Sequence, residues 1–155
     1  MVDLNYGWMH QSFGLVRMDH TKKPLYKRPK FYAVQHVTSV FTPDMKVTDE
    51  VNVIAQYNVK LTSYGLKKDG KNVGCMLWCS GDRPSDVLER RFVDINITGM
   101  TFKEPVYVDM LTGYVHDLKL IVRRINGVSY DFNDLPVWDS PILIMEKSAL
   151  NLKNE

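Results

Sequence analysis

The sequence predicts a mainly β protein, an antiparallel β-sandwich of about seven or eight strands preceded by one N-terminal α-helix. Short segments in which apolar and polar residues alternate, at the period of a strand, begin near Met45 and continue almost to the end of the chain. Turn signals separate these segments roughly every 8–12 residues, which favours a sandwich over a parallel sheet. The apolar spacing of an amphipathic helix occurs in one segment, residues 29–41.

The chain is long enough for one domain with a short extension. Its 155 residues can bury a core, and its 45% of hydrophobic and 25% of charged residues are typical of soluble globular proteins. We expect residues 1–44 to form a tail that consists of a loop, a short strand and the helix. Residues 45–155 are expected to form the β-sandwich.

Charge and hydropathy argue against two classes of partner. A net charge of +2 is too small to indicate nucleic acid or an anionic membrane. Basic residues gather near the N-terminal loop, but they do not repeat along a face, so a solvated loop is the simpler interpretation. No apolar stretch approaches the length of a bilayer, and no signal peptide is visible. We therefore expect a soluble chain, and whether its parent protein is secreted or periplasmic stays open.

The N-terminal tail has three recognisable parts. Residues 13–17 can form a short strand, and Pro24 and Pro29 then predict a loop because each proline biases its predecessor away from helix. Pro29 suits the first turn of a helix, and Thr42-Pro43 ends it. The apolar stripe of this helix predicts a docking face made of Ala33, Val34, Val37, Val40 and Phe41.

The first strands surround a clear hairpin. Residues 51–66 read as one or two strands, and Lys68-Asp69-Gly70-Lys71 is a turn of the Asp-Gly type. Residues 72–79 are apolar on both faces, which predicts a central strand covered on both sides. We expect Trp78 to lie in the core with Met76, and the opposite face to carry Val73, Cys75, Leu77 and Cys79.

Further strands follow with short turns between them. Leu111-Thr112-Gly113 is a turn in which glycine can supply positive φ, and Asn126-Gly127 is another. The strands expected on either side of these turns span residues 93–97, 106–110, 118–125, 128–132 and 142–145.

Neither disulfide, metal nor cofactor chemistry is expected. Cys75 and Cys79 lie four residues apart on one strand, roughly 13 Å, whereas a disulfide needs Cα atoms within about 7 Å. The four histidines form no cluster with ligand spacing. One group of charged residues could suggest an active site, but the simpler interpretation is that these residues pair with one another in solvent. The group comprises Asp82, Arg83, Asp86, Glu89, Arg90 and Arg91.

One stretch of the tail suggests a family. Phe13-Gly14-Leu15 is followed by a loop with Lys23-Pro24 and Arg28-Pro29, and then by Tyr32-Ala33 and Gln35 on the predicted helix. This pattern resembles the C-terminal end of clan-A glycoside hydrolases, most closely the β-xylosidase type with an attached β-sandwich. The resemblance implies that the helix is the last helix of a barrel. Two later segments are similar to the sandwich of such enzymes, Gly81-Asp82-Arg83-Pro84 and Asp139-Ser140-Pro141.

The same resemblance implies that this chain lacks the catalytic residues. Retaining glycosidases need two carboxyl groups about 5–5.5 Å apart. In this clan the two glutamates lie at the ends of the fourth and seventh barrel strands, regions that would precede residue 1. No glutamate of this chain lies in such a motif, so we assign no catalytic residue.

Two main hypotheses follow. In the first, the chain is a non-catalytic accessory domain of a glycoside hydrolase that braces the missing barrel, and the detached chain forms a homo-oligomer through Val34, Val37 or Phe41. In the second, it is a carbohydrate-binding module that holds polysaccharide on exposed rings. The candidate sugar contacts are Trp8, His10, Phe13 and Trp138. A residual hydrolase is the least favoured alternative.

Overall fold

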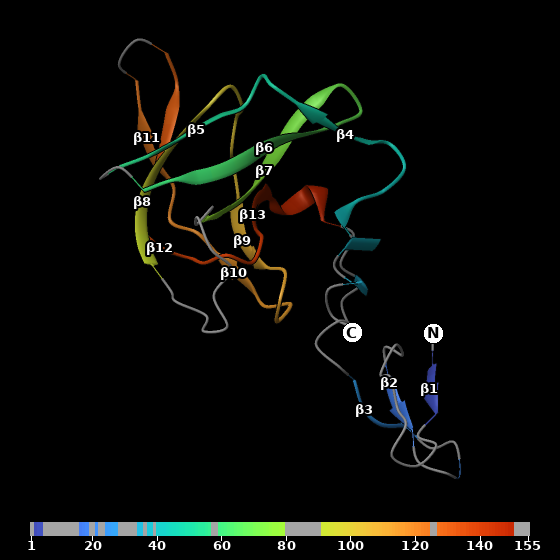
Figure 1. Ribbon diagram of the computed structural model, residues 1–155. Helices are drawn as coiled ribbons and strands as arrows, with labels where there is room; N and C mark the ends of the chain where they lie inside the picture. Colours follow the sequence, from blue (N-terminus) through green and yellow to red (C-terminus); the bar gives the residue numbers. More distant parts are fainter. Residues whose placement is uncertain are drawn as a thin grey trace.

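The computed structural model shows a mainly β protein built around two antiparallel sheets (Figure 1). It describes residues 2–4, 16–18, 21, 24–27, 34–35, 37–38, 40–56, 59–79, 91–124 and 127–150. The larger sheet has six strands in the order β10-β9-β13-β7-β6-β4, and the smaller has four in the order β11-β12-β8-β5. Among the described residues, no helix is long and apolar enough to cross a membrane.

The strands of the six-stranded sheet come from the whole length of the sandwich. They are β4 (Met45–Thr48), β6 (Leu61–Lys68), β7 (Lys71–Cys79), β9 (Pro105–Asp109), β10 (Val115–Asp117) and β13 (Ile142–Glu146). The four-stranded sheet contains β5 (Asn52–Ala55), β8 (Arg91–Thr98), β11 (Ile121–Arg123) and β12 (Ser129–Val137). A short 3-10 helix, η1 (Lys147–Ala149), follows β13.

The main core lies between the two sheets. Inward-facing side chains of β7, β9 and β13 meet those of β8 and β12, and Phe102 packs edge-on against both Tyr130 and Phe132. The buried aliphatic side chains alternate along β8, with Val93, Ile95 and Ile97 pointing inward. This alternation is the one that the sequence predicts for residues 93–97.

A second apolar cluster covers the outer face of the six-stranded sheet. Most of its buried members are strand residues that do not face the first core, namely Leu66, Val106, Val108, Leu143 and Met145. Met110, which follows β9, and Val40 are buried with them. Phe41 and the C-terminal residues Ala149 and Leu150 pack against this cluster. The central strands are therefore covered on both sides, as their apolar character on both faces predicts.

Two predicted turns are present, and the third, Asn126-Gly127, lies partly outside the described residues because Asn126 is not described. Asp69 and Gly70 both have positive φ, 50° and 74°, as an Asp-Gly hairpin requires, and they join β6 to β7. Gly113, at φ 83°, lies in the turn between β9 and β10. Gly127, at φ 119°, precedes β12.

The strand number predicted from the sequence is too low. The two sheets contain ten strands, and the two that no predicted segment contains are β4 and β10, which have only four and three residues. So short a strand contains at most two apolar–polar alternations, which is too few for the pattern to show. A further sheet, of β1 (Val2–Leu4), β2 (Val16–Met18) and β3 (Pro24–Lys27), belongs to the N-terminal tail.

The loop predicted between Pro24 and Pro29 is wrong, because Pro24 to Lys27 form strand β3. Among the described residues, β3 pairs with β2 alone and is an edge strand of its sheet. Proline is tolerated at the first residue of an edge strand because no ladder bond needs its missing N–H.

The N-terminal helix predicted over residues 29–41 is not seen. Within this segment, the described residues with helical backbone lie between Val34 and Val40, and Phe41 N donates a hydrogen bond to Val37 O at 2.8 Å. β-Branched valine and threonine are frequent here, and they lower helix propensity by restricting χ1. The hydroxyl of Thr38 also bonds the backbone carbonyls of Val34 and Gln35.

Two side chains of β7 differ from their predicted positions. Val73 packs on the outer cluster and not with Cys75, because the register shifts between Leu66 and Lys67 and leaves Val73 as the extra residue of a bulge. Trp78 is only partly buried, and its ring stacks on the exposed ring of Tyr64 with centroids 5.8 Å apart.

Candidate functional site

The β9–β10 hairpin forms one wall of a pocket, and its turn is rigidly built. The buried carboxylate of Asp109 accepts hydrogen bonds from Leu111 N at 2.8 Å and from the Thr112 hydroxyl at 2.7 Å. Gly113 N donates to Asp109 O, and Asp109 N donates to Tyr114 O. An aspartate that bonds the backbone two residues ahead stabilises such a turn. The turn therefore holds Tyr114 at a defined position.

Three rings lie next to one another on this hairpin. Tyr107 of β9 is the direct partner of His116 on β10, and their ring centroids are 6.2 Å apart. Tyr114 lies two residues before His116, and these rings are also 6.2 Å apart. The Tyr107 ring is buried in the core, whereas His116 is exposed and the Tyr114 side chain is 68% exposed. The rings thus run from the core to the surface.

Strand β12 forms the opposite wall through a bulge. Phe132 pairs with Ile95 and Leu135 pairs with Val93, so Asn133 and Asp134 both stand opposite Asp94. Asp134 has a φ of 53°, and its N–H donates to the carboxylate of Asp94 at 2.9 Å. Both bulge residues are exposed as a result.

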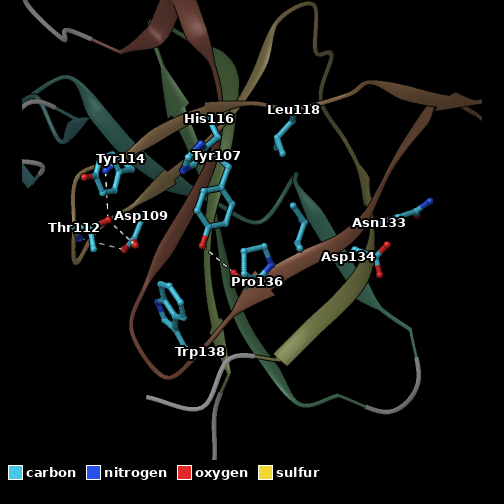
Figure 2. A pocket seen from close by; sticks show the side chains of 11 residues that line it. Tyr107, Asp109, Thr112, Tyr114, His116, Leu118, Asn133, Asp134, Pro136 and Trp138 are labelled. Carbon is cyan, nitrogen blue, oxygen red and sulfur yellow. Dashed lines mark hydrogen bonds between the residues drawn. The ribbon is translucent and has the colours of Figure 1, made fainter. Parts of the chain in front are cut away.

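The two walls enclose a pocket of about 380 Å³ (Figure 2). The hydroxyl of Tyr107 donates to Pro136 O at 2.8 Å, which links β9 to β12 across the pocket. The lining residues are Tyr107, Asp109, Thr112, Tyr114, His116, Leu118, Asn133, Asp134, Leu135, Pro136 and Trp138. The lining therefore combines aromatic rings and aliphatic side chains with a few polar groups, as ligand pockets commonly do.

Of the four predicted sugar contacts, Trp138 lies at this pocket. Its side chain is 95% buried and belongs to the main core, so it supports the pocket and presents little surface. Trp8, His10 and Phe13 lie outside the described residues.

The predicted docking face is divided. Val34 and Val37 are 43% and 46% exposed, whereas Val40 is buried and Phe41 is half-buried against the six-stranded sheet. Ala33 lies outside the described residues.

Sequence reasoning missed the ring set on the hairpin. The apolar residues Val106, Val108 and Met110 indicate one face of β9, so Tyr107 and Asp109 must lie on the other face. The short turn ending at Gly113 folds β10 back along β9, which pairs Tyr107 with His116. These two signals together could have located the rings.

The remaining groups to place are the metal-ligating side chains, the thiols and the charged cluster. The described ranges contain no group of three or more His, Cys, Asp or Glu side chains that could hold a metal ion. Cys75 and Cys79 are free thiols, and complete burial raises the pKa of Cys75 to about 12. Of the charged group predicted near residues 82–91, only Arg91 is described, and it is exposed.

Comparison of this chain with protein-family models, with curated proteins and with solved structures finds no match.

Proposed function

We propose that this chain is a non-catalytic accessory β-sandwich of a glycoside hydrolase, whose partner is the barrel domain of that enzyme. The observation that carries the proposal is the exposed apolar pair Val34 and Val37, which continues the stripe whose other end packs on the sandwich. The family pattern in the N-terminal tail supports the identity of the partner.

The apolar stripe suits a segment that joins two domains, because one end of the stripe is buried and the other end is exposed. Val40 and Phe41 pack on the outer cluster of the six-stranded sheet, which anchors the segment to the sandwich. Val34 and Val37 leave apolar surface in water that a neighbouring domain could cover. Each Å² of apolar surface removed from water stabilises a contact by roughly 25 cal/mol.

The polar groups of the pocket also favour an accessory role. The Asp109 carboxylate is held by hydrogen bonds within its own turn, from Leu111 N, Thr112 N and the Thr112 hydroxyl. A carboxylate used in this way stabilises the hairpin.

Sedimentation of the full chain tests the exposed stripe. Without its barrel, the chain should self-associate as concentration rises, and Val34→Asp/Val37→Asp should remain monomeric. Val47→Asp is a control because Val47 is an exposed valine on β4 that does not belong to the stripe, and this variant should associate like the wild type. If the wild-type chain remains monomeric at high concentration, the proposed bracing role is contradicted.

An assay of hydrolysis separates the accessory role from a residual enzyme. The full chain should release nitrophenol from nitrophenyl xyloside, glucoside and galactoside no faster than buffer. Release above background that survives purification would replace the accessory proposal by a catalytic one.

A further inference from the structure

We propose that the pocket between the β9–β10 hairpin and β12 binds a neutral oligosaccharide, with Tyr114 and His116 as the ring platform. This assigns a ligand site to the sandwich itself and therefore goes beyond the bracing role. The proposal rests on the ring set, on the charge of the lining and on a neighbouring hollow.

The ring set offers a surface that suits a sugar. A pyranose presents C–H groups on its faces, and these groups are attracted to the negative face of an aromatic ring. Tyr114 and His116 are exposed and lie next to each other, and the buried Tyr107 stands behind His116. In Figure 2, Tyr114 lies to the left, His116 lies above, and Tyr107 lies between His116 and Pro136.

The charge of the lining disfavours an anionic ligand. The described lining residues include two carboxylates, Asp109 and Asp134, and neither lysine nor arginine. An anionic ligand such as a phosphate or a uronic acid would be repelled by this charge. Carboxylate and amide groups can instead bond sugar hydroxyls, and the exposed side chains of Asp134 and Asn133 supply them.

A second hollow lies beside the pocket, along the chain that links β10 to β11. This hollow, of about 220 Å³, shares Leu118, Asn133 and Leu135 with the main pocket and continues to Lys119 and Ile121. A ligand longer than one sugar ring could therefore remain in contact with the protein. The shared residues make an oligosaccharide a better fit than a monosaccharide.

The pocket is already arranged before a ligand arrives. The Asp109 turn holds the end of the hairpin, and the bond from Tyr107 to Pro136 O joins the two walls. Tyrosine rings also have few rotatable bonds, so ordering them on binding costs little entropy. These features lower the cost of binding a flexible polyol.

Affinity electrophoresis of the full chain through gels containing xylan, glucan or galactan tests the proposal. At least one polysaccharide should retard the wild type, and Tyr114→Ala should weaken the apparent affinity about three- to tenfold, the range expected for one aromatic contact. Tyr114→Ala should fold normally because this side chain is exposed. Trp138→Ala is unsuitable because Trp138 is in the core.

Tyr64→Ala is the matched control. Tyr64 is another exposed tyrosine, 45% exposed, but it lies on β6 outside the pocket. This variant should be retarded like the wild type, and polygalacturonate, an anionic polymer, should not compete. The proposal is overturned if none of the three polysaccharides retards the wild type. Equal retardation of wild type and Tyr114→Ala also overturns it, as does a loss confined to Tyr64→Ala.

Discussion

Gly99 occupies a position where a side chain has no room. Its φ is +84°, and a Cβ atom there would lie 1.8 Å from the backbone oxygen of Glu50. The carbonyl of Gly99 accepts a hydrogen bond from Asn72, whose amide also binds the carboxylate of Glu50. A hydrogen bond from Lys67 lowers the pKa of this carboxyl group. Gly99 thus allows the chain after β8 to approach the chain before β5 closely.

We expect Gly99→Ala to lower the free energy of unfolding by more than about 3 kcal/mol, because both backbone strain and a backbone clash must be relieved. Gly70→Ala is the control, since Gly70 also has positive φ but has open space around it. That variant should cost only about 1–2 kcal/mol. Urea denaturation measures both, and equal losses would show that the clash is absent.

Burial of the Cys75 thiol should make stability depend on pH. Complete burial raises the pKa from 9.0 to about 12 in the folded protein. Between these values the unfolded chain loses the thiol proton and the folded chain keeps it, so stability falls as pH rises, by about 1.4 kcal/mol per pH unit. Below pH 9 this contribution is fully present.

The Cys75→Ala variant isolates this effect from lysine and tyrosine titration. Its stability deficit relative to the wild type, measured by urea denaturation, should be smaller at pH 10 than at pH 8. A deficit that stays constant between the two pH values would mean that the thiol of Cys75 titrates normally in the folded state.

At the scale of elements, a polar clip connects three strands of the smaller sheet. Asp131 of β12 is buried, and its carboxylate accepts a hydrogen bond from Asn96 of β8 at 2.6 Å and pairs with Arg123 of β11. A buried carboxylate needs such partners because unpaired burial is costly. The short strand β11 is therefore held to β12 partly by this ion pair.

We expect Arg123→Ala to destabilise the protein by about 1–2 kcal/mol, less than a fully buried pair would, because the arginine itself is largely exposed. The neighbouring Arg124→Ala should change stability by less than about 0.5 kcal/mol. Amide hydrogen exchange should show that β11 opens faster in Arg123→Ala than in the wild type, and that it opens at the wild-type rate in Arg124→Ala. Indistinguishable exchange in the two variants would argue against the clip.

At the scale of the whole molecule, the short helical segment packs on the sandwich through one of its sides, and its other side is exposed. Val40 is fully buried against the six-stranded sheet, whereas Val37, three residues earlier, is exposed. Val40→Ala should therefore cost about 1–3 kcal/mol of stability, and Val37→Ala less than about 0.5 kcal/mol. Thermal unfolding compares the two variants. Similar small effects would mean that the segment does not stabilise the sandwich.

Prediction from the sequence succeeded where a local pattern is sufficient. The alternation along β8 and the Asp69-Gly70 turn depend on neighbouring residues, and both are present in the structure. It failed at Val73 and Pro24, where a bulge in one strand and an edge position in another sheet override the local pattern. The pocket escaped prediction because its walls, β9–β10 and β12, are separated in sequence and meet only through strand pairing.

The amino-acid sequence by itself determined the mainly β character, the hairpin turns and the apolar faces of the central strands. These properties follow from periodicity and from the positive φ that glycine and aspartate tolerate at turns. Only the tertiary structure decided that the rings of the hairpin face β12 across a pocket, because the hydroxyl of Tyr107 reaches Pro136 O of a strand far away in the sequence. It also decided which valines of the helical segment remain in water, because the outer sheet face covers Val40 and leaves Val34 and Val37 exposed.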